Sequence, residues 1–142
     1  MDYSLFYGEN ADEKLIEKRI RDLFEQFYNA EGVYPEKIFS SPGRAEILGN
    51  HTDHNCGKVI VAAISCDILA AVKKTNDGKI KIISEGFSPV SADLSDLKFV
   101  EGEIGTSAAL CKGVANALKE KNLPIGGFTA HFTSSVFKGA GV

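Results

Sequence analysis

The sequence lacks tryptophan and contains only one methionine and three cysteines in 142 residues. The cysteines are odd in number and match no zinc-ligand spacing, which favours neither a disulfide framework nor a structural zinc site. We interpret them as small apolar packing residues with free thiols, namely Cys56, Cys66 and Cys111. Free thiols are typical of a reducing compartment, so the sequence predicts a cytoplasmic location.

Long apolar runs are also missing, as is a strong excess of positive charge. No stretch approaches the roughly 18 residues of a membrane span, and the first residues lack the cationic and apolar parts of a signal peptide. The net charge is −3, and the acidic excess falls within residues 1–36. We therefore expect neither a membrane nor a nucleic acid as partner. The mildly basic remainder tolerates a phosphorylated ligand without requiring one.

What is present begins with an amphipathic helix over about residues 12–30. Asn10 or Asp12 can cap its start, and Gly32 followed by Pro35 ends it. Its apolar residues recur at helical spacing and comprise Ile16, Ile20, Leu23, Phe24 and Phe27. Plain core packing is the preferred interpretation of this stripe. We treat residues 1–36 as an N-terminal segment built around this amphipathic helix.

The remainder predicts strands and one further helix. The strands and apolar stretches are Lys37–Ser41, Ala45–Leu48, Val59–Ala63, Asp67–Lys74, Lys79–Ser84 and Phe128–Phe132. Pro42-Gly43 should interrupt the chain, and the turn Asn76-Asp77-Gly78 should join two strands in a hairpin. Residues 86–104 predict a polar loop with a short helical turn. A helix from Thr106 or Ser107 to about Lys121 should then turn four residues inward, namely Leu110, Val114, Ala117 and Leu118. Strands, then helix, then strand indicate an α+β fold.

A polar loop at residues 49–57, together with nearby Arg44, is dense in hydrogen-bonding side chains. Such groups are costly to bury unless each finds a partner, and sugar hydroxyls both donate and accept. The composition therefore fits a carbohydrate pocket. Two alternatives stay open. The pattern His51-x-Asp53-His54 also suits a divalent metal, and a polar turn held by its own Asx bonds would bind nothing.

A second candidate lies at residues 139–141, where Gly-Ala-Gly follows the last predicted strand. Glycines allow backbone N–H groups to approach an anion closely, as in phosphate-cradling loops. Alone this pattern is weak, because paired glycines after a strand more often form an ordinary turn.

Taken together, these two segments resemble the galactokinases of the GHMP kinase family. Residues 43–57, GRAEILGNHTDHNCG, resemble the signature G-R-x-N-[LI]-[IL]-G-E-H-T-D-Y-N-x-G. Residues 136–142, VFKGAGV, are similar to the opening of the family's phosphate loop, P-x-G-x-G-L-S-S-S-A. Residues 102–105 and 112–114 also resemble the segment before that loop. The resemblance covers nearly the whole chain from about residue 37, and we expect the chain to be an N-terminal portion of such a kinase.

This resemblance implies a fold and a reaction. The fold is that of the GHMP kinase N-terminal domain, of the ribosomal protein S5 domain 2-like type, here truncated. It is a mixed, mostly antiparallel sheet with helices packed on one face, and residues 37–142 would be a partial copy of it. The implied reaction is ATP-dependent phosphorylation of the anomeric hydroxyl of galactose. The implied partners are galactose or a related hexose, and ATP.

The same resemblance assigns roles to residues. Arg44 matches the arginine beside the transferred phosphoryl, where a guanidinium stabilises developing charge. Asp53 matches the acceptor for two sugar hydroxyls, within a substrate-binding stretch that comprises Asn50, His51, Thr52 and Asp53. The implied ATP-binding residues are Ser84, Gly139, Ala140, Gly141 and Val142. Mg²⁺ is implied with ATP. Its ligands and the catalytic aspartate would lie beyond residue 142, so no metal ligand is assigned in this chain and the fragment itself is expected to be inactive.

The chain departs from the family pattern at four positions. Asn50 replaces a glutamate, Glu46 an asparagine, His54 a tyrosine and Phe137 a proline. The loss of a carboxylate at position 50 keeps two alternatives open: a catalytically dead sugar-binding regulator, and a sugar kinase with another substrate. A kinase for a non-sugar alcohol is disfavoured by the motif His51-Thr52-Asp53.

Overall fold

The computed structural model describes residues 3–49 and 56–136. The elements follow one another as α1 (Ser4–Tyr7), α2 (Glu13–Glu31), β1 (Lys37–Leu48), β2 (Ile60–Lys74), β3 (Lys79–Ser84), β4 (Val90–Asp93), the 3₁₀ turn η2 (Glu101–Glu103), α3 (Ser107–Glu120) and β5 (Phe128–Ser134). The α+β class is confirmed. The 3₁₀ turn lies within the predicted polar loop, whereas the short strand β4 and helix α1 were not predicted.

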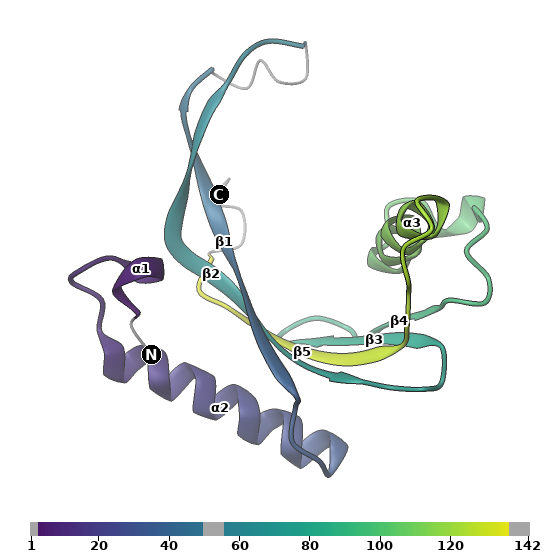
Figure 1. Ribbon diagram of the computed structural model, residues 1–142, viewed down its shortest axis with the longest axis horizontal. Helices are drawn as coiled ribbons and strands as arrows, with labels where there is room; N and C mark the ends of the chain where they lie inside the picture. Colours follow the sequence, from purple (N-terminus) through teal and green to yellow (C-terminus); the bar gives the residue numbers. More distant parts are fainter. Residues whose placement is uncertain (1–2, 50–55, 137–142) are drawn as a thin grey trace.

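Within the described residues, five strands form one sheet in the order β1-β2-β5-β3-β4 (Figure 1). All neighbouring pairs are antiparallel except β3 with β5, which are parallel, so the expected mixed, mostly antiparallel sheet is confirmed. The predicted hairpin pairing of β2 with β3 is wrong. Gly78 makes the expected turn at φ 68°, but β5 lies between the two strands that it joins. The turn residues determine only that the chain reverses direction between β2 and β3. Which strand pairs with β2 depends on the packing of the whole sheet.

Strands β1 and β2 are longer than the sequence suggests. Pro42-Gly43 does not end β1; it lies at a shift in register between the pairs Pro42–Asp67 and Arg44–Ala63. A β-bulge tolerates proline and glycine inside a strand, which is why the predicted break is wrong. Beyond Ile68, toward its N-terminal end, β2 pairs only with β1, so these two strands extend from the sheet as an arm (Figure 1).

Helix α2 carries the expected caps and covers one face of the sheet. The Asp12 carboxylate accepts from the Leu15 N–H at 3.1 Å, and Gly32 ends the helix at φ 69°. Its apolar stripe packs on β2, in a core formed by Leu23, Phe27, Leu69 and Ala71. Core packing of this stripe is therefore confirmed.

The two long helices lie on opposite faces of the sheet, which corrects the expectation that helices pack on one face. Lys81 of β3 reaches Glu31 of α2 at 2.9 Å. Successive strand residues point to opposite faces, and Ile80 lines the cleft beneath α3 together with Phe128, its register partner. Figure 1 shows α2 and α3 separated by the sheet. Within Lys79–Ile82 the two isoleucines face α3, whereas Lys81 makes a polar contact with α2.

Helix α3 begins at the predicted cap, since the Thr106 hydroxyl accepts from the Ala109 N–H at 3.1 Å. Its predicted inward residues are not covered: Leu110 is 70% exposed and Val114 56% exposed. Only Ala115 is buried in this helix. Leu110, Val114 and Leu118 line an open cleft of about 410 Å³ between α3 and the sheet, whereas Ala117 is exposed and does not. Helical spacing thus identified the apolar face but not whether anything covers it.

Candidate functional site

Arg44 lies on the arm, on β1 opposite Ala63 of β2, with an exposed side chain. The predicted sugar-binding residues Asn50, His51, Thr52 and Asp53 lie outside the described residues, in the connection from β1 to β2. The metal and polar-turn alternatives for His51, Asp53 and His54 fall there too.

Gly49, the last described residue before that connection, has a backbone that only glycine suits. Its φ is 136°, and a Cβ built on it would lie 2.5 Å from Cγ1 of Val59. A side chain here would be strained and would also collide with Val59, the residue before β2. The glycine at this place in the signature therefore has a local structural cause.

The predicted phosphate-loop residues Gly139, Ala140, Gly141 and Val142 also lie outside the described residues. The structure does describe the three residues at the end of β5 that lead to them, Ser134, Ser135 and Val136, which we call the loop base. The Ser135 N–H donates to the Asp67 carbonyl at 2.9 Å, and the Ser135 hydroxyl accepts from the Asp67 N–H at 2.9 Å. The loop base is thus hydrogen-bonded to the backbone of β2 at Asp67.

Register brings the loop base near the strand of Arg44. Asp67 pairs with Pro42 on its β1 side and meets Ser135 on its β5 side. Arg44 follows Pro42 by two residues but pairs with Ala63, four residues from Asp67 along β2, so Arg44 and the loop base lie on opposite sides of β2 at different levels. The segments that lead to the predicted sugar and phosphate motifs therefore approach one another at Asp67.

Ser84, the predicted nucleotide-contacting residue, ends β3 and pairs with Phe132 of β5. Strands β3 and β5 are parallel, so their carboxyl ends lie at the same end of the sheet. Ser84 is consequently at the same end of the sheet as the loop base. Its partner on β5, Phe132, precedes the first residue of the loop base by two positions.

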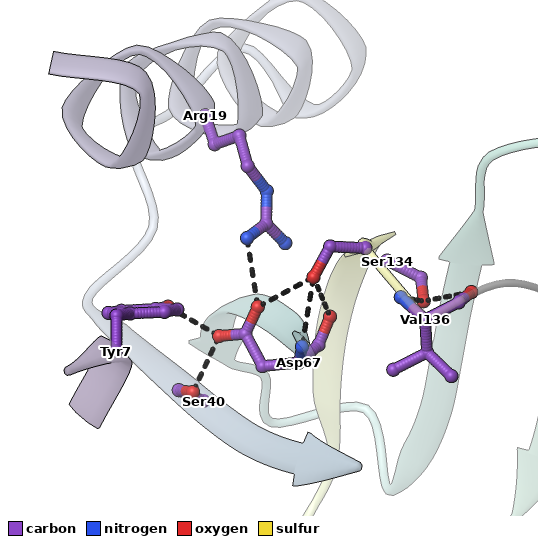
Figure 2. A network of polar contacts seen from close by, with 7 residues as sticks. Tyr7, Arg19, Ser40, Asp67, Ser134 and Val136 are labelled. Atoms are coloured by element: carbon purple, nitrogen blue, oxygen red, sulfur yellow. Dashed lines mark hydrogen bonds and ion pairs between the residues drawn. The ribbon is translucent and has the colours of Figure 1, made fainter. Parts of the chain in front are cut away.

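A buried carboxylate that sequence reasoning missed holds this region together. Figure 2 shows Tyr7, Arg19 and Ser40 converging on Asp67, whose side chain is 3% exposed. Arg19 Nη1 donates to Oδ1 at 2.8 Å, while Ser40 Oγ at 2.6 Å and the Tyr7 hydroxyl donate to Oδ2. The Ser135 hydroxyl lies 3.3 Å from Oδ1. We call these five residues the Asp67 cluster.

The cluster shifts two titrating groups in opposite directions. Burial by itself would raise the pKa of Asp67, but hydrogen bonds from Ser40, Tyr7 and Arg19 outweigh it and the pKa lies below its ordinary value. Burial and the neighbouring carboxylate raise the pKa of Tyr7. At neutral pH the cluster therefore holds an anionic Asp67 and a protonated Tyr7 that donates to it.

The sequence carried a signal for this carboxylate. Asp67 is the only charged residue between Lys58 and Lys73, in an otherwise apolar stretch. A charge in a buried strand requires a partner. Its partner could not be identified from the sequence, because Arg19 and Tyr7 lie far away along the chain.

A cleft of about 850 Å³ opens beside the cluster, between α1, α2 and the first two strands. Its walls are mainly apolar and include Leu5, Phe6 and Phe39. None of its lining residues is a predicted site residue, so we do not assign the sugar to it.

Three further observations concern the described residues only. The three cysteines are free, as expected, and burial raises the pKa of the Cys111 thiol. Residues 3–49 and 56–136 contain no group of three or more metal-ligating side chains. No helix in these ranges is long and apolar enough to cross a membrane.

Known proteins are similar to this chain over the segments described above. The model of the galactokinase galactose-binding signature matches residues 22–74, from α2 through β2. The galactokinase of Streptomyces coelicolor is 31% identical over 123 residues, which are 87% of this chain and 31% of that protein. The chain thus spans about a third of the length of the curated relatives that it matches.

Solved structures are similar to this chain as well. Lactococcus lactis galactokinase complexed with galactose superimposes with a TM-score of 0.69 at 27% identity, over 84% of this chain and 32% of that one. Methanococcus jannaschii mevalonate kinase, at a TM-score of 0.55 and 19% identity over 74% of this chain and 34% of that one, shares the fold. The expected GHMP kinase fold is confirmed. This chain is thus similar to the galactokinases over about a third of their length.

Proposed function

We propose that this chain supplies the sugar-recognition loop and the first part of the ATP-phosphate loop of a galactokinase. The observation that carries the proposal is the match to the galactose-binding signature over residues 22–74, in a fold where β1 and the loop base flank β2. Both motifs are needed for transfer, because the sugar hydroxyl and the phosphoryl group must meet in one place.

The proposed reaction is transfer of the γ-phosphoryl of ATP to the anomeric hydroxyl of galactose. A bond forms between phosphorus and the anomeric oxygen, the bond from phosphorus to the β–γ bridging oxygen of ATP breaks, and ADP leaves. The hydroxyl proton passes to a carboxylate base, an aspartate that we place outside residues 1–142. Mg²⁺ would neutralise phosphate charge, and none of its ligands is assigned in this chain.

The residues of this chain bind the sugar and ATP and orient them for transfer. Asp53 accepts hydrogen bonds from two sugar hydroxyls, with Asn50, His51 and Thr52 in the same loop. Arg44 stabilises the charge that develops on the transferred phosphoryl. Ser84 contacts the nucleotide, and Gly139, Ala140, Gly141 and Val142 offer backbone N–H groups to the phosphates.

Three further assignments stay proposals. Residues 1–36 form the N-terminal helical segment and residues 37–142 a partial kinase domain. The protein works in the cytoplasm. We expect no turnover from residues 1–142 alone, because the curated relatives are about three times as long.

The test is a coupled ADP-release assay with the product of the complete gene and a panel of hexoses. We expect turnover with galactose, and loss of galactose binding in Asp53→Ala by calorimetry. The matched control is Asp77→Ala, which removes an exposed turn carboxylate outside both motifs. Unchanged galactose affinity in Asp53→Ala would refute the role of that residue.

A sugar-binding regulator without catalysis is the second candidate, and Asn50 in place of a glutamate favours it. Galactose binding without ADP release would support the regulator and contradict the kinase. If the kinase acts on another hexose, Asn50→Glu should shift its preference toward galactose. An unchanged sugar profile would exclude position 50 as the determinant.

A further inference from the structure

We propose that Asp67 is a positioning residue that holds the loop base against β2, with its carboxylate oriented by the two N-terminal helices. The inference rests on the proposed function, since it assigns the loop base to the nucleotide side of the site. It adds a residue outside both sequence motifs. It also gives the N-terminal segment a task in nucleotide binding.

Asp67 is suited to positioning because its oxygens are already occupied. A carboxylate has about four acceptor directions. Three donors occupy this one: Tyr7 and Ser40 at Oδ2, and Arg19 at Oδ1. The single proton of the Ser135 hydroxyl is shared between the Asp67 carbonyl oxygen at 3.2 Å and Oδ1 at 3.3 Å. With a side chain only 3% exposed, it has neither the access nor the capacity to bind a substrate.

The contact with the loop base involves the backbone as well as the side chain. The Ser135 N–H and hydroxyl both reach main-chain atoms of Asp67, at 2.9 Å in each case. The Val136 N–H then donates to the Ser134 hydroxyl at 3.0 Å. The direction in which the chain leaves β5 is thus fixed by several bonds within three residues, centred on Asp67.

The N-terminal helices determine how the carboxylate is oriented. Tyr7 comes from α1 and Arg19 from α2, and Figure 2 shows both approaching Asp67 from the helical side. Arg19 Nη2 is buried and has no partner among the described residues, while Nη1 is paired with Asp67. Loss of the carboxylate would therefore remove the partner of Nη1 and leave it beside an Nη2 that already has none.

Accurate placement of the loop base matters because phosphoryl transfer depends on positioning. A displacement of about 1 Å can cost roughly 100-fold in rate. The level of the loop base along β2 is the level of Pro42 on β1, two residues before Arg44. A loosened loop base would therefore move the phosphates relative to Arg44.

The experiment compares three variants. Asp67→Asn keeps the size of the side chain but replaces one acceptor oxygen with a donor that faces other donors. Ser135→Ala is milder, since it removes only the hydroxyl and keeps the backbone bond; it serves if Asp67→Asn does not fold. Phe27→Leu is the control, because it weakens the core under α2 without touching the Asp67 cluster.

Two readouts separate positioning from general destabilisation. In the 142-residue chain, the rate of hydrogen exchange at the backbone amide of residue 135 should rise roughly tenfold in Asp67→Asn or Ser135→Ala. This rise should exceed the rise in Phe27→Leu when the variants are compared at matched global stability. In the product of the complete gene, the same two variants should raise KM for ATP by a larger factor than KM for the sugar.

The outcomes divide clearly. Equal exchange in the control and the cluster variants would overturn the anchoring. Faster exchange with an unchanged KM for ATP would overturn the positioning role. A wild-type protein that phosphorylates no sugar would overturn the proposed function, whereas the exchange result would still decide whether Asp67 anchors the loop base.

Discussion

At the scale of single residues, Asp67 is a charge on which polar contacts from four distant segments of the described chain converge. Its donors come from α1, α2, β1 and the end of β5. Removing one partner of a buried ion pair costs far more than removing an exposed one, because the remaining group is left uncompensated.

Asp67→Asn should therefore lower the free energy of unfolding by about 3 kcal/mol. The matched control is Glu103→Gln, which removes the more accessible ion pair with Lys112 and should cost at most about 1 kcal/mol. Urea unfolding followed by circular dichroism measures both. Similar losses in the two variants would show that the carboxylate of Asp67 is not a principal stabilising group.

Acid should destabilise the chain through the same residue. The pKa of Asp67 is lowered in the folded state, so the unfolded chain binds more protons as the pH falls below about 4. The stabilisation is present above that range and is lost as the pH falls through the folded-state pKa. Urea midpoints between pH 7 and pH 2 should fall more steeply in the wild type than in Asp67→Asn. Parallel pH profiles would contradict this assignment.

Sequence reasoning at this scale found motif residues but not the residue that organises their surroundings. Arg44 and Gly49 were identified by their places in a linear signature. Asp67 was visible only as an isolated charge in an apolar stretch. Its role depends on Arg19 and Tyr7, which are brought to it by tertiary structure, and a linear pattern does not encode that meeting.

At the scale of elements, local chemistry predicted the ends of helices well. Asp12, Gly32 and Thr106 act as expected, because capping depends on a few consecutive residues. The pairing of β2 with β3 and the faces of the sheet that the helices cover were predicted wrongly. Both depend on tertiary structure, since β5, which is distant in the sequence, lies between β2 and β3.

A pair of glycine variants tests the helix ends. Gly32→Ala and Gly113→Ala both introduce a Cβ into open space. Gly32 has φ 69°, so alanine there should cost about 1 kcal/mol, whereas Gly113 lies inside α3 and alanine should stabilise it by about 0.5–1 kcal/mol. Thermal unfolding measures the change in melting temperature of each variant. We expect a decrease for Gly32→Ala and an increase for Gly113→Ala, and shifts of the same sign would contradict the backbone argument.

At the scale of the whole molecule, the described surface exposes many large apolar side chains. Those above 60% exposed include Leu5, Phe6, Tyr34, Ile47, Leu48, Phe99, Ile104 and Leu110. Leu110 lines the open apolar cleft beside α3 together with Val114 and Leu118, and contiguous apolar surface of this kind marks an interaction site. The curated relatives are about three times as long as this chain.

The 142-residue chain should therefore self-associate as its concentration rises. Val114→Lys, on the exposed face of α3, should weaken association, while Ala117→Lys adds the same charge to the same helix without removing a large apolar group. Sedimentation velocity over a concentration series measures this. A chain that stays monomeric at all concentrations, or equal effects of the two variants, would contradict the expectation.

The central claim is that the signature loop and the loop base bring a sugar hydroxyl and the ATP phosphates together. Phosphorus NMR of the gene product incubated with galactose and MgATP tests it most directly. We predict a new phosphomonoester whose phosphorus couples to the anomeric proton, in an amount equal to the ADP formed. ADP without a sugar phosphate, or a phosphate on another hydroxyl, would contradict the account.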